Sequence, residues 1–198
     1  MATLPTSLTE LEAVNLMLSV IGEAPINSFS DETIDDIALA RTVLDDTLKE
    51  TLELGWHVNT DEEYPLTPDG DGFINLPANV ARVDIDRRHQ HSQPDVVQRG
   101  SRLYDRDDRT YVFTAPIKVT VIWYLAYDEV DPATKRFVAI RAARKFAERT
   151  VGAPDISGFT ERDELEAKAR MLEAESDVSD HNFMNEYTAA RMLHRIIG

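Results

Sequence analysis

The chain has 198 residues with a formal net charge of −15, and 42% of them are hydrophobic and 29% charged, which is the composition of a globular protein. It contains no cysteine, so disulfides, thiolate zinc sites and cysteine nucleophiles are excluded. The acidic balance argues against tight phosphate binding, and no apolar run approaches the roughly 20 residues that a membrane helix needs.

The acidic residues are unevenly distributed. The first 56 residues carry eleven Asp and Glu against two Lys and Arg, whereas residues 131–198 carry twelve against eleven. An acidic first segment and an Arg-rich last segment attract each other. We therefore expect them to pair, either within one subunit or between neighbours.

Two helices are predicted in the first 55 residues. Ser7 and Glu10 have the spacing of a capping box, and apolar residues then recur at helical intervals up to Gly22, a typical helix stop. A second amphipathic helix is predicted over residues 33–54, ended by Gly55.

The hydrophobic period changes after Trp56. Apolar residues alternate over 117–125, which predicts a strand. Proline- and glycine-containing turns separate shorter strand candidates, which are 73–76, 81–86, 95–98, 101–104 and 111–114. This spacing favours an antiparallel sheet or a small sandwich.

Helical signals return at Asp131 and Pro132, an N-cap followed by a first-turn proline, and continue to Gly152. A fourth helix is predicted from Thr160 towards Glu175, followed by an amphipathic piece over 183–197. The predicted class is α+β: a four-helix-type bundle (1–56 and 127–180) carries an inserted antiparallel β-domain (57–126) and a C-terminal docking tail (181–198).

Two segments resemble metal sites. The turn formed by Asp69, Gly70, Asp71 and Gly72 looks like a calcium loop, but the twelfth position is Val80 where an EF-hand needs glutamate, so a hairpin turn is favoured. His89 and His91 form a His-x-His pair that could begin a metal site. Their Gln, Ser and Pro neighbours favour a loop instead, and no metal or other cofactor is predicted.

No catalytic constellation emerges, because most carboxylates lie on expected helix faces or in turns. Arg141, Arg144, Lys145 and Arg149 gather on one side of the third helix. Nucleic-acid contact, a solvated face and ion pairing with an acidic surface compete to explain them. Nucleic-acid contact is the weakest, because few aromatic residues interleave with these cations. The C-terminal piece places apolar residues on a short tail, where they serve as an interaction element as often as a core: Phe183, Tyr187, Met192, Leu193, Ile196 and Ile197.

The chain resembles a known family along most of its length. The segments that carry this resemblance, in chain order, are 13–26 with its Gly-Glu-x-Pro exit, 55–63, 66–69, 103–106, 127–130, 141–146, 152–154, 163–164 and 182–184. They are similar to the tail tubular protein A family of short-tailed bacteriophages, which are head–tail adaptors or gatekeepers. The resemblance rests on the common order of these segments, and residues 80–98 match least.

The resemblance implies a structural virion protein in the neck of the tail, made in the host bacterial cytoplasm and without enzymatic activity. It implies a dodecameric ring between the portal and a nozzle similar to tail tubular protein B, with double-stranded DNA passing through the bore without sequence recognition and no membrane contact. In such a ring we expect the acidic side chains of Asp35, Asp36 and Asp46 to meet Arg141, Arg144 and Arg149 of a neighbour. We also expect the C-terminal tail to bind the portal, and the loops with Asp69 to Gly72 and with His89 and His91 to face the nozzle.

Two other functions remain open from the residues alone. A virion-associated hydrolase of cell-wall glycan, as the main role or a secondary one, needs a pair of carboxylates that counting cannot exclude. A nucleic-acid-binding module is the least favoured, because of the acidic charge balance.

Overall fold

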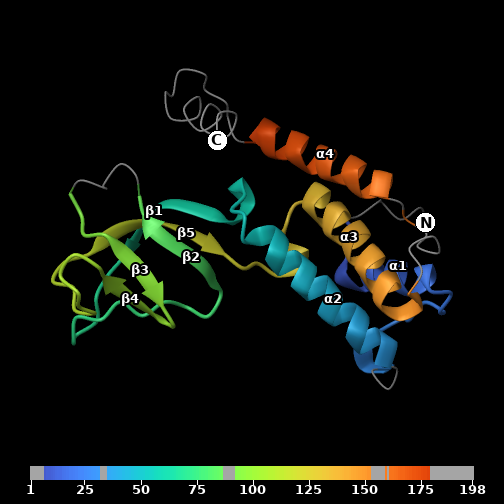
Figure 1. The fold of residues 1–198 in the computed structure, drawn as a ribbon, viewed down its shortest axis with the longest axis horizontal. Coiled ribbons are helices and arrows are strands. Elements are labelled where there is room, and N and C mark those ends of the chain that lie inside the picture. Colours follow the sequence, from blue (N-terminus) through green and yellow to red (C-terminus); the bar gives the residue numbers. More distant parts are fainter. Residues whose placement is uncertain (1–6, 32–34, 87–91, 153–158, 160, 179–198) are drawn as a thin grey trace, which may run out of the picture.

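In the computed structural model, residues 7–31, 35–86, 92–152, 159 and 161–178 are described. Within these ranges, four α-helices and five strands follow one another as α1 (Glu10–Val20), α2 (Asp35–Leu52), β1 (Thr60–Leu66), β2 (Val80–Ile85), β3 (Val96–Arg99), β4 (Arg102–Asp105), β5 (Ile117–Trp123), α3 (Pro132–Val151) and α4 (Glu161–Val178). The helices lie at one end of an elongated molecule and the strands at the other (Figure 1). We call these ends the helical lobe and the β-lobe. The predicted α+β class with antiparallel sheets is confirmed.

The first helix begins two residues later than its predicted cap. Thr9, not Ser7, is the N-cap: its hydroxyl accepts from the Glu12 backbone N–H at 3.2 Å, and the Glu12 carboxylate accepts from the Thr9 N–H at 2.8 Å. The sequence offers two overlapping Ser/Thr-x-x-Glu patterns. The later one leaves Glu10 within the helix, where its carboxylate pairs with Arg41 of α2 at 3.2 Å.

The helix α3 is the centre of the helical lobe and packs against α1, α2 and α4. Its start is as predicted, because the Asp131 carboxylate accepts from the backbone N–H groups of Ala133 and Thr134 at 2.9 and 3.0 Å. Its end is also as predicted, at Gly152 with a φ of 71°. One face of α3 is fully buried in the core of the lobe and includes Val138, Ala139, Ala142, Ala143 and Phe146. Small side chains on this face let the neighbouring helices approach closely.

The β-lobe contains two small antiparallel sheets. β5 is the central strand of a sheet with the order β1-β5-β2, and β3 pairs with β4 in a two-stranded sheet. The predicted strands 81–86, 95–98, 101–104 and 117–125 correspond to β2, β3, β4 and β5 within one or two residues. The side chains that pack between the sheets form a second hydrophobic cluster, which includes Ile74, Val83, Val96, Leu103, Val119 and Val121.

Three strand assignments differ from the prediction. Residues 73–76 and 111–114 form only isolated bridges, such as Phe73 with Val112. Pro77 follows the first segment directly, and Pro116 follows the second after one residue. Proline has no backbone N–H to donate to a strand ladder. The edge strand β1 was not predicted. Its buried positions do not alternate, because Glu63 has a φ of 54° and the register shifts between Asp61 and Tyr64.

The two lobes meet at Asn59, whose side chain is 2% exposed. Its amide nitrogen donates to the carbonyl of Leu52, the last residue of α2, at 2.9 Å, and to the carbonyl of Trp123, the last residue of β5, at 2.7 Å. Its amide oxygen accepts from the Trp56 N–H at 2.8 Å. Asn59 therefore joins the end of a helix, the connecting segment and the end of the central strand.

Gly55 makes this junction possible. It has a φ of 75°, and a β-carbon at this position would lie 2.6 Å from Cδ1 of Ile122. The chain thus turns sharply out of α2 and passes directly over β5, which no other residue type allows without displacement of Ile122.

The substitution Asn59→Ala is expected to lower the free energy of unfolding by about 2 kcal/mol, because it removes three hydrogen bonds to backbone groups at the junction. The Leu52 carbonyl keeps the Gly55 N–H as a donor at 3.0 Å. Urea denaturation followed by circular dichroism measures this loss. Asn27→Ala is the control, since Asn27 is exposed and its removal should change stability by less than about 0.5 kcal/mol. Equal effects of the two substitutions would contradict the role of Asn59.

Candidate functional site

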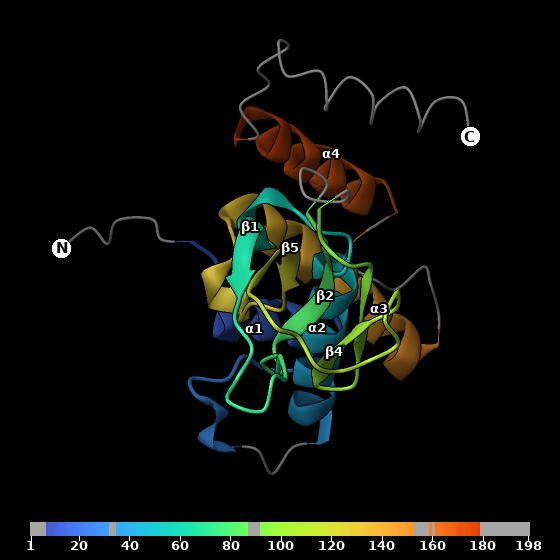
Figure 2. The same ribbon diagram turned by 90° about the vertical axis from the view of Figure 1, so that its left-hand side faces the viewer.

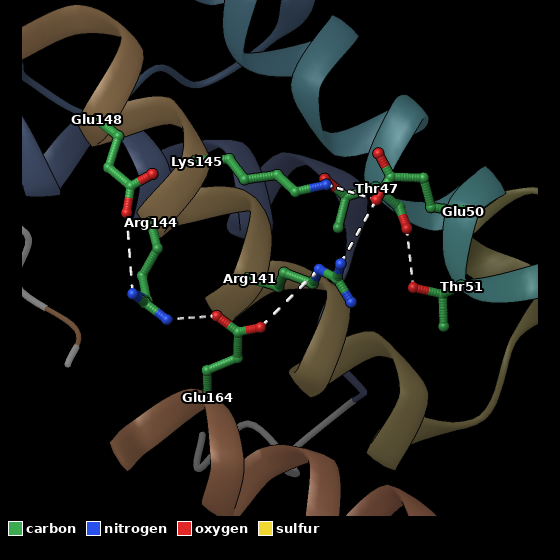
Figure 3. A network of polar contacts seen from close by, with 8 residues as sticks. All are labelled: Thr47, Glu50, Thr51, Arg141, Arg144, Lys145, Glu148 and Glu164. Atoms are coloured by element: carbon green, nitrogen blue, oxygen red, sulfur yellow. Dashed lines mark hydrogen bonds and ion pairs between the residues drawn. The ribbon is translucent and has the colours of Figure 1, made fainter. Parts of the chain in front are cut away.

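The most connected group of charged side chains lies on α3 and joins three helices (Figure 3). Arg144 Nη1 contacts Glu164 Oε2 of α4 at 2.6 Å, and Arg141 Nε lies 3.8 Å from Glu164 Oε1. Arg144 Nη2 also lies 3.8 Å from Glu148 one turn along α3. Glu164 therefore holds α4 against α3 through two arginines.

The same face of α3 is tied to α2 through Glu50. Lys145 Nζ contacts Glu50 Oε2 at 2.6 Å, and Arg141 Nη2 lies 3.6 Å from the same oxygen. The hydrogen bond from Lys145 holds the pKa of Glu50 below its ordinary value, and the charges of Lys145 and Arg141 act in the same direction. Arg141 stands between Glu50 and Glu164 and connects the two halves of the network (Figure 3).

Helical spacing explains why these cations meet two different helices. Residues 141, 144, 145 and 148 lie on one side of α3, since positions three and four apart are neighbours on a helix surface. The opposite side is the buried face with Ala142 and Phe146. The expected pairing of the Arg-rich segment with the acidic first segment is thus present within one chain, through Glu50.

The charged residues expected at a subunit interface divide into two groups. Arg141 and Arg144 are paired within the chain, as described above. Asp46 and Arg149 have exposed side chains and form no ion pair within 4 Å among the residues that the structure describes. Asp35 and Asp36 form the first turn of α2, where carboxylates favour the positive end of the helix.

The turn at Asp69 is held by its own carboxylate. Asp69 Oδ1 accepts from the backbone N–H groups of Asp71 and Phe73 at 3.0 and 2.9 Å, and Oδ2 accepts from the Asn75 side-chain amide at 2.9 Å. At the end of the turn Gly72 has a φ of 83°, and a β-carbon there would lie 2.8 Å from Cγ1 of Val112. The acidic and glycine residues of this segment thus form a turn, and its exposed tip leaves Gly70 and Asp71 accessible.

The other predicted site residues lie outside the described part of the chain. These are His89 and His91 and the C-terminal residues Phe183, Tyr187, Met192, Leu193, Ile196 and Ile197. Within the described part, no three His, Asp or Glu side chains are grouped as a metal site, and no helix there is long and apolar enough to cross a membrane.

Two buried carboxylates were not singled out from the sequence. Asp105 Oδ1 accepts from the backbone N–H groups of Asp107 and Asp108 at 2.8 and 3.0 Å, and Asp86 Oδ2 accepts from the Glu63 N–H at 3.0 Å. Asp105 closes the turn after β4, and Asp86 holds the irregular part of β1 against the end of β2. The Asp-x-Asp-Asp run at 105–108 is the signal that predicts such a turn.

Comparison with known proteins shows what kind of protein this arrangement belongs to. A family model described as tail tubular protein matches residues 11–181, which include α1 from its second residue, both sheets and α4. The chain belongs to the tail tubular protein family. It is also similar to tail tubular protein A of Klebsiella phage KP34, with 28% identity over 131 residues that cover 66% of this chain and 67% of the relative.

A tail tubular protein is a structural component of a phage tail. We therefore interpret the network on α3 as a feature that stabilises a subunit for assembly. It fixes α4 on α3 and α3 on α2, and it thereby fixes the surfaces that the helical lobe presents. Its expected contribution is positional, because half-exposed ion pairs add little free energy each.

The substitution Glu164→Gln tests whether this network fixes α4. We expect the free energy of unfolding to fall by about 1 kcal/mol, because Arg144 and Arg141 both lose their carboxylate partner on a partly buried surface. Amide exchange in α4 should accelerate while exchange in α1 stays unchanged. Glu166→Gln is the matched control: Glu166 pairs with Arg170 within α4 on an exposed surface, so its loss should cost less than about 0.5 kcal/mol.

Lowering the pH should weaken the contact between α2 and α3. Since Lys145 lowers the pKa of Glu50 from an ordinary value of 4.5, the ionised carboxylate contributes stability at neutral pH, and this contribution disappears as the pH falls through 4.5 and below. Urea denaturation at several pH values should show wild type more stable than Glu50→Gln by at most about 1 kcal/mol at pH 7 and equal to it near pH 3. Glu173 is exposed, so the free energy of unfolding of Glu173→Gln should stay close to that of wild type at every pH.

Proposed function

We propose that this tail tubular protein is a head–tail adaptor: it forms a ring that joins the portal to the tail nozzle and lines part of the DNA exit channel. The observation that carries the proposal is the family match over residues 11–181 together with the similarity to a tail tubular protein A. The match spans both lobes, so it concerns the whole architecture and not one motif.

The shape of the subunit supports an adaptor. Two lobes with separate hydrophobic clusters lie end to end along the long axis (Figure 1). In Figure 2, which looks along that axis, the strands lie in front of the helices. A subunit of this kind offers different contact surfaces at its two ends. We propose that residues 1–56 with 127–180 and residues 57–126 act as separate docking domains, each towards its own partner.

A closed ring of identical subunits needs two different complementary surfaces on each subunit. Charges that form no ion pair among the described residues provide one such pair: Asp35, Asp36 and Asp46 on α2 of one subunit, and Arg149 on α3 of the next. Arg141 and Arg144 are already paired with Glu50 and Glu164, so in the ring they act by holding the helical lobe together and contact a neighbour only secondarily.

The partners follow from the order of parts in a tail neck. We propose that the tail over 181–198 binds the portal, and that the Asp69–Gly72 turn and the loop with His89 and His91 face the nozzle, a protein similar to tail tubular protein B. Double-stranded DNA passes through the lumen of the ring without sequence recognition. A net charge of −15 per subunit repels phosphates, which helps DNA to slide. The subunit is made in the host bacterial cytoplasm and ends in the virion.

Electron microscopy and analytical ultracentrifugation of the purified chain, alone and with a portal, test the ring. We expect rings of about twelve copies, and closed rings imply a heterologous interface. Arg149→Glu should shift the protein towards monomers, and the added substitution Asp46→Arg should restore the ring. Lys118→Glu, the same change of charge on the β-lobe, is the control and should leave the ring intact. A chain that remains monomeric both alone and with a portal would overturn the proposal.

A further inference from the structure

The helix α4 lies on the outside of the helical lobe and packs on α3 (Figures 1 and 2). Its inner face carries Ala167 and Met171, which are buried in the core of the lobe. A different side of the helix carries Leu165 and Leu172, whose exposed fractions are 62% and 46%. Ala169 lies between them and is exposed as well. We call Leu165, Ala169 and Leu172 the α4 stripe.

The spacing of the α4 stripe is that of a helix face which packs against another element. Residues three and four apart are neighbours on one side of a helix. Single exposed apolar side chains are common on protein surfaces, whereas an apolar stripe at helical spacing is typical of a face turned towards a partner. Within the described residues, both leucines remain largely open to solvent. The α4 stripe therefore lacks a neighbour in the described part of the chain.

The segment that follows α4 in the chain has a matching apolar pattern. This segment lies outside the described residues, and its pattern is a property of the sequence. After the polar residues 179–182, apolar side chains recur at helical intervals, at Phe183, Tyr187, Ala190, Leu193 and Ile197. The pattern predicts an amphipathic helix over 183–197 that needs a cover for one face.

The chain between the two segments has the length of a helix hairpin connection. Four residues separate Val178, the last residue of α4, from Phe183, and antiparallel neighbouring helices are joined by roughly two to five residues. At about 1.5 Å per residue, a helix over 183–197 is about 21 Å long, and the part of α4 from Leu165 to its end is about 20 Å long. The two apolar faces thus match in length as well as in kind.

The charges of the two segments are complementary. Residues 161–178 carry seven Asp and Glu against three Lys and Arg, which gives −4. Residues 183–198 carry one Glu against two Arg, which gives +1. Segments of opposite charge attract each other. The acidic surface of α4 therefore favours the C-terminal segment as its neighbour.

We propose that residues 183–197 pack antiparallel on the α4 stripe of their own chain in a subunit that has not bound a portal. In this hairpin, Leu172 comes opposite Ala190, and Leu165 comes opposite Ile197. The short connection holds the segment near α4 at an effective concentration on the order of millimolar. At lower protein concentrations, the segment of the same chain therefore occupies the stripe in preference to that of a second copy.

Portal binding and the hairpin compete for the same apolar side chains. The residues proposed above to bind the portal include Phe183, Tyr187 and Ile197, which cover the α4 stripe in the hairpin. A portal must therefore displace the segment from α4. Only this release rests on the proposed function, because the packing of the segment on α4 concerns the subunit alone.

Disulfide formation in the purified full chain tests the hairpin. The chain has no cysteine, so a pair introduced by Ala169→Cys and His194→Cys reports on one contact. In the hairpin these positions lie on the same flank of the contact. Arg195→Cys with Ala169→Cys is the matched control, since residue 195 lies about 100° further round the helix and away from α4.

We expect the pair with His194→Cys to form a disulfide at least roughly tenfold faster than the control pair under mild oxidation, because only the former brings the two thiols within bonding distance. Electrophoresis without reductant should show the link within a monomer. Equal rates for the two pairs, or links that join two chains, would overturn the inference. Circular dichroism checks that both variants are folded.

Trypsin cleavage after Arg191 tests the hairpin without cysteines. The double variant Leu165→Gln with Leu172→Gln should be cleaved there at least roughly fivefold faster than wild type, because a segment packed on α4 must open before it is cleaved. Both leucines are exposed among the described residues, so the lobe should remain folded. Leu54→Gln, the same change at a leucine that is 64% exposed at the end of α2, is the control and should leave the rate unchanged. A double variant cleaved at the wild-type rate would contradict the hairpin.

A portal protein added to the pair with His194→Cys separates this inference from the proposed function. Portal added before oxidation should slow disulfide formation, and a disulfide formed first should weaken portal binding. If the link forms but neither effect is seen, the hairpin stands and the proposed role of the C-terminal segment in portal binding fails. If the chain binds the portal normally and the link does not form in the free chain, this inference alone fails.

Discussion

The relative position of the two lobes depends on one buried amide. The hydrogen bonds of Asn59 connect the end of α2, the connecting segment and the end of β5. Only a side chain with two N–H donors and an acceptor can make these three contacts at once, and aspartate would place a carboxylate against two carbonyl oxygens. A displacement at this point would misplace the surfaces of one lobe relative to those of the other.

Neighbouring contacts reinforce the same junction from both sides. The indole N–H of Trp56 donates to the Thr51 carbonyl at 2.6 Å, and the Tyr124 hydroxyl donates to Glu53 at 2.8 Å. On the other side, the Glu175 carboxylate of α4 accepts from the His57 N–H at 2.8 Å. The α4 helix therefore contacts both the network on α3 and the start of the β-lobe, and the ion pairs of Glu164 and the hydrogen bond of Glu175 together fix it at its two ends.

Much of the fold could be predicted from the sequence because it rests on local signals. The Asp131 cap, the Gly152 stop and the alternation in β5 are each encoded within a few residues. The strand β1 and the junction could not be predicted in this way: β1 is an edge strand with a bulge and little apolar alternation, and Asn59 acts through residues up to 64 positions away. At the candidate site, helical spacing predicted the cluster of Arg141, Arg144 and Lys145, but the choice of Glu50 and Glu164 as partners depends on tertiary packing.

The distribution of charge separates residues that hold the subunit together from residues that remain available. On α3, Arg141, Arg144 and Lys145 form ion pairs with carboxylates of α2 and α4. Arg149 one turn further is exposed and forms no ion pair among the described residues, although its charge also helps to lower the pKa of Glu50. The β-lobe also has an exposed strand edge at β2, and unpaired backbone groups at such an edge can cause aggregation before assembly. Asp84 limits that risk by covering one outward N–H with its own carboxylate. The two charges therefore differ in their effect: Asp84 hinders pairing of β2 with a second copy, whereas Arg149 remains exposed on α3.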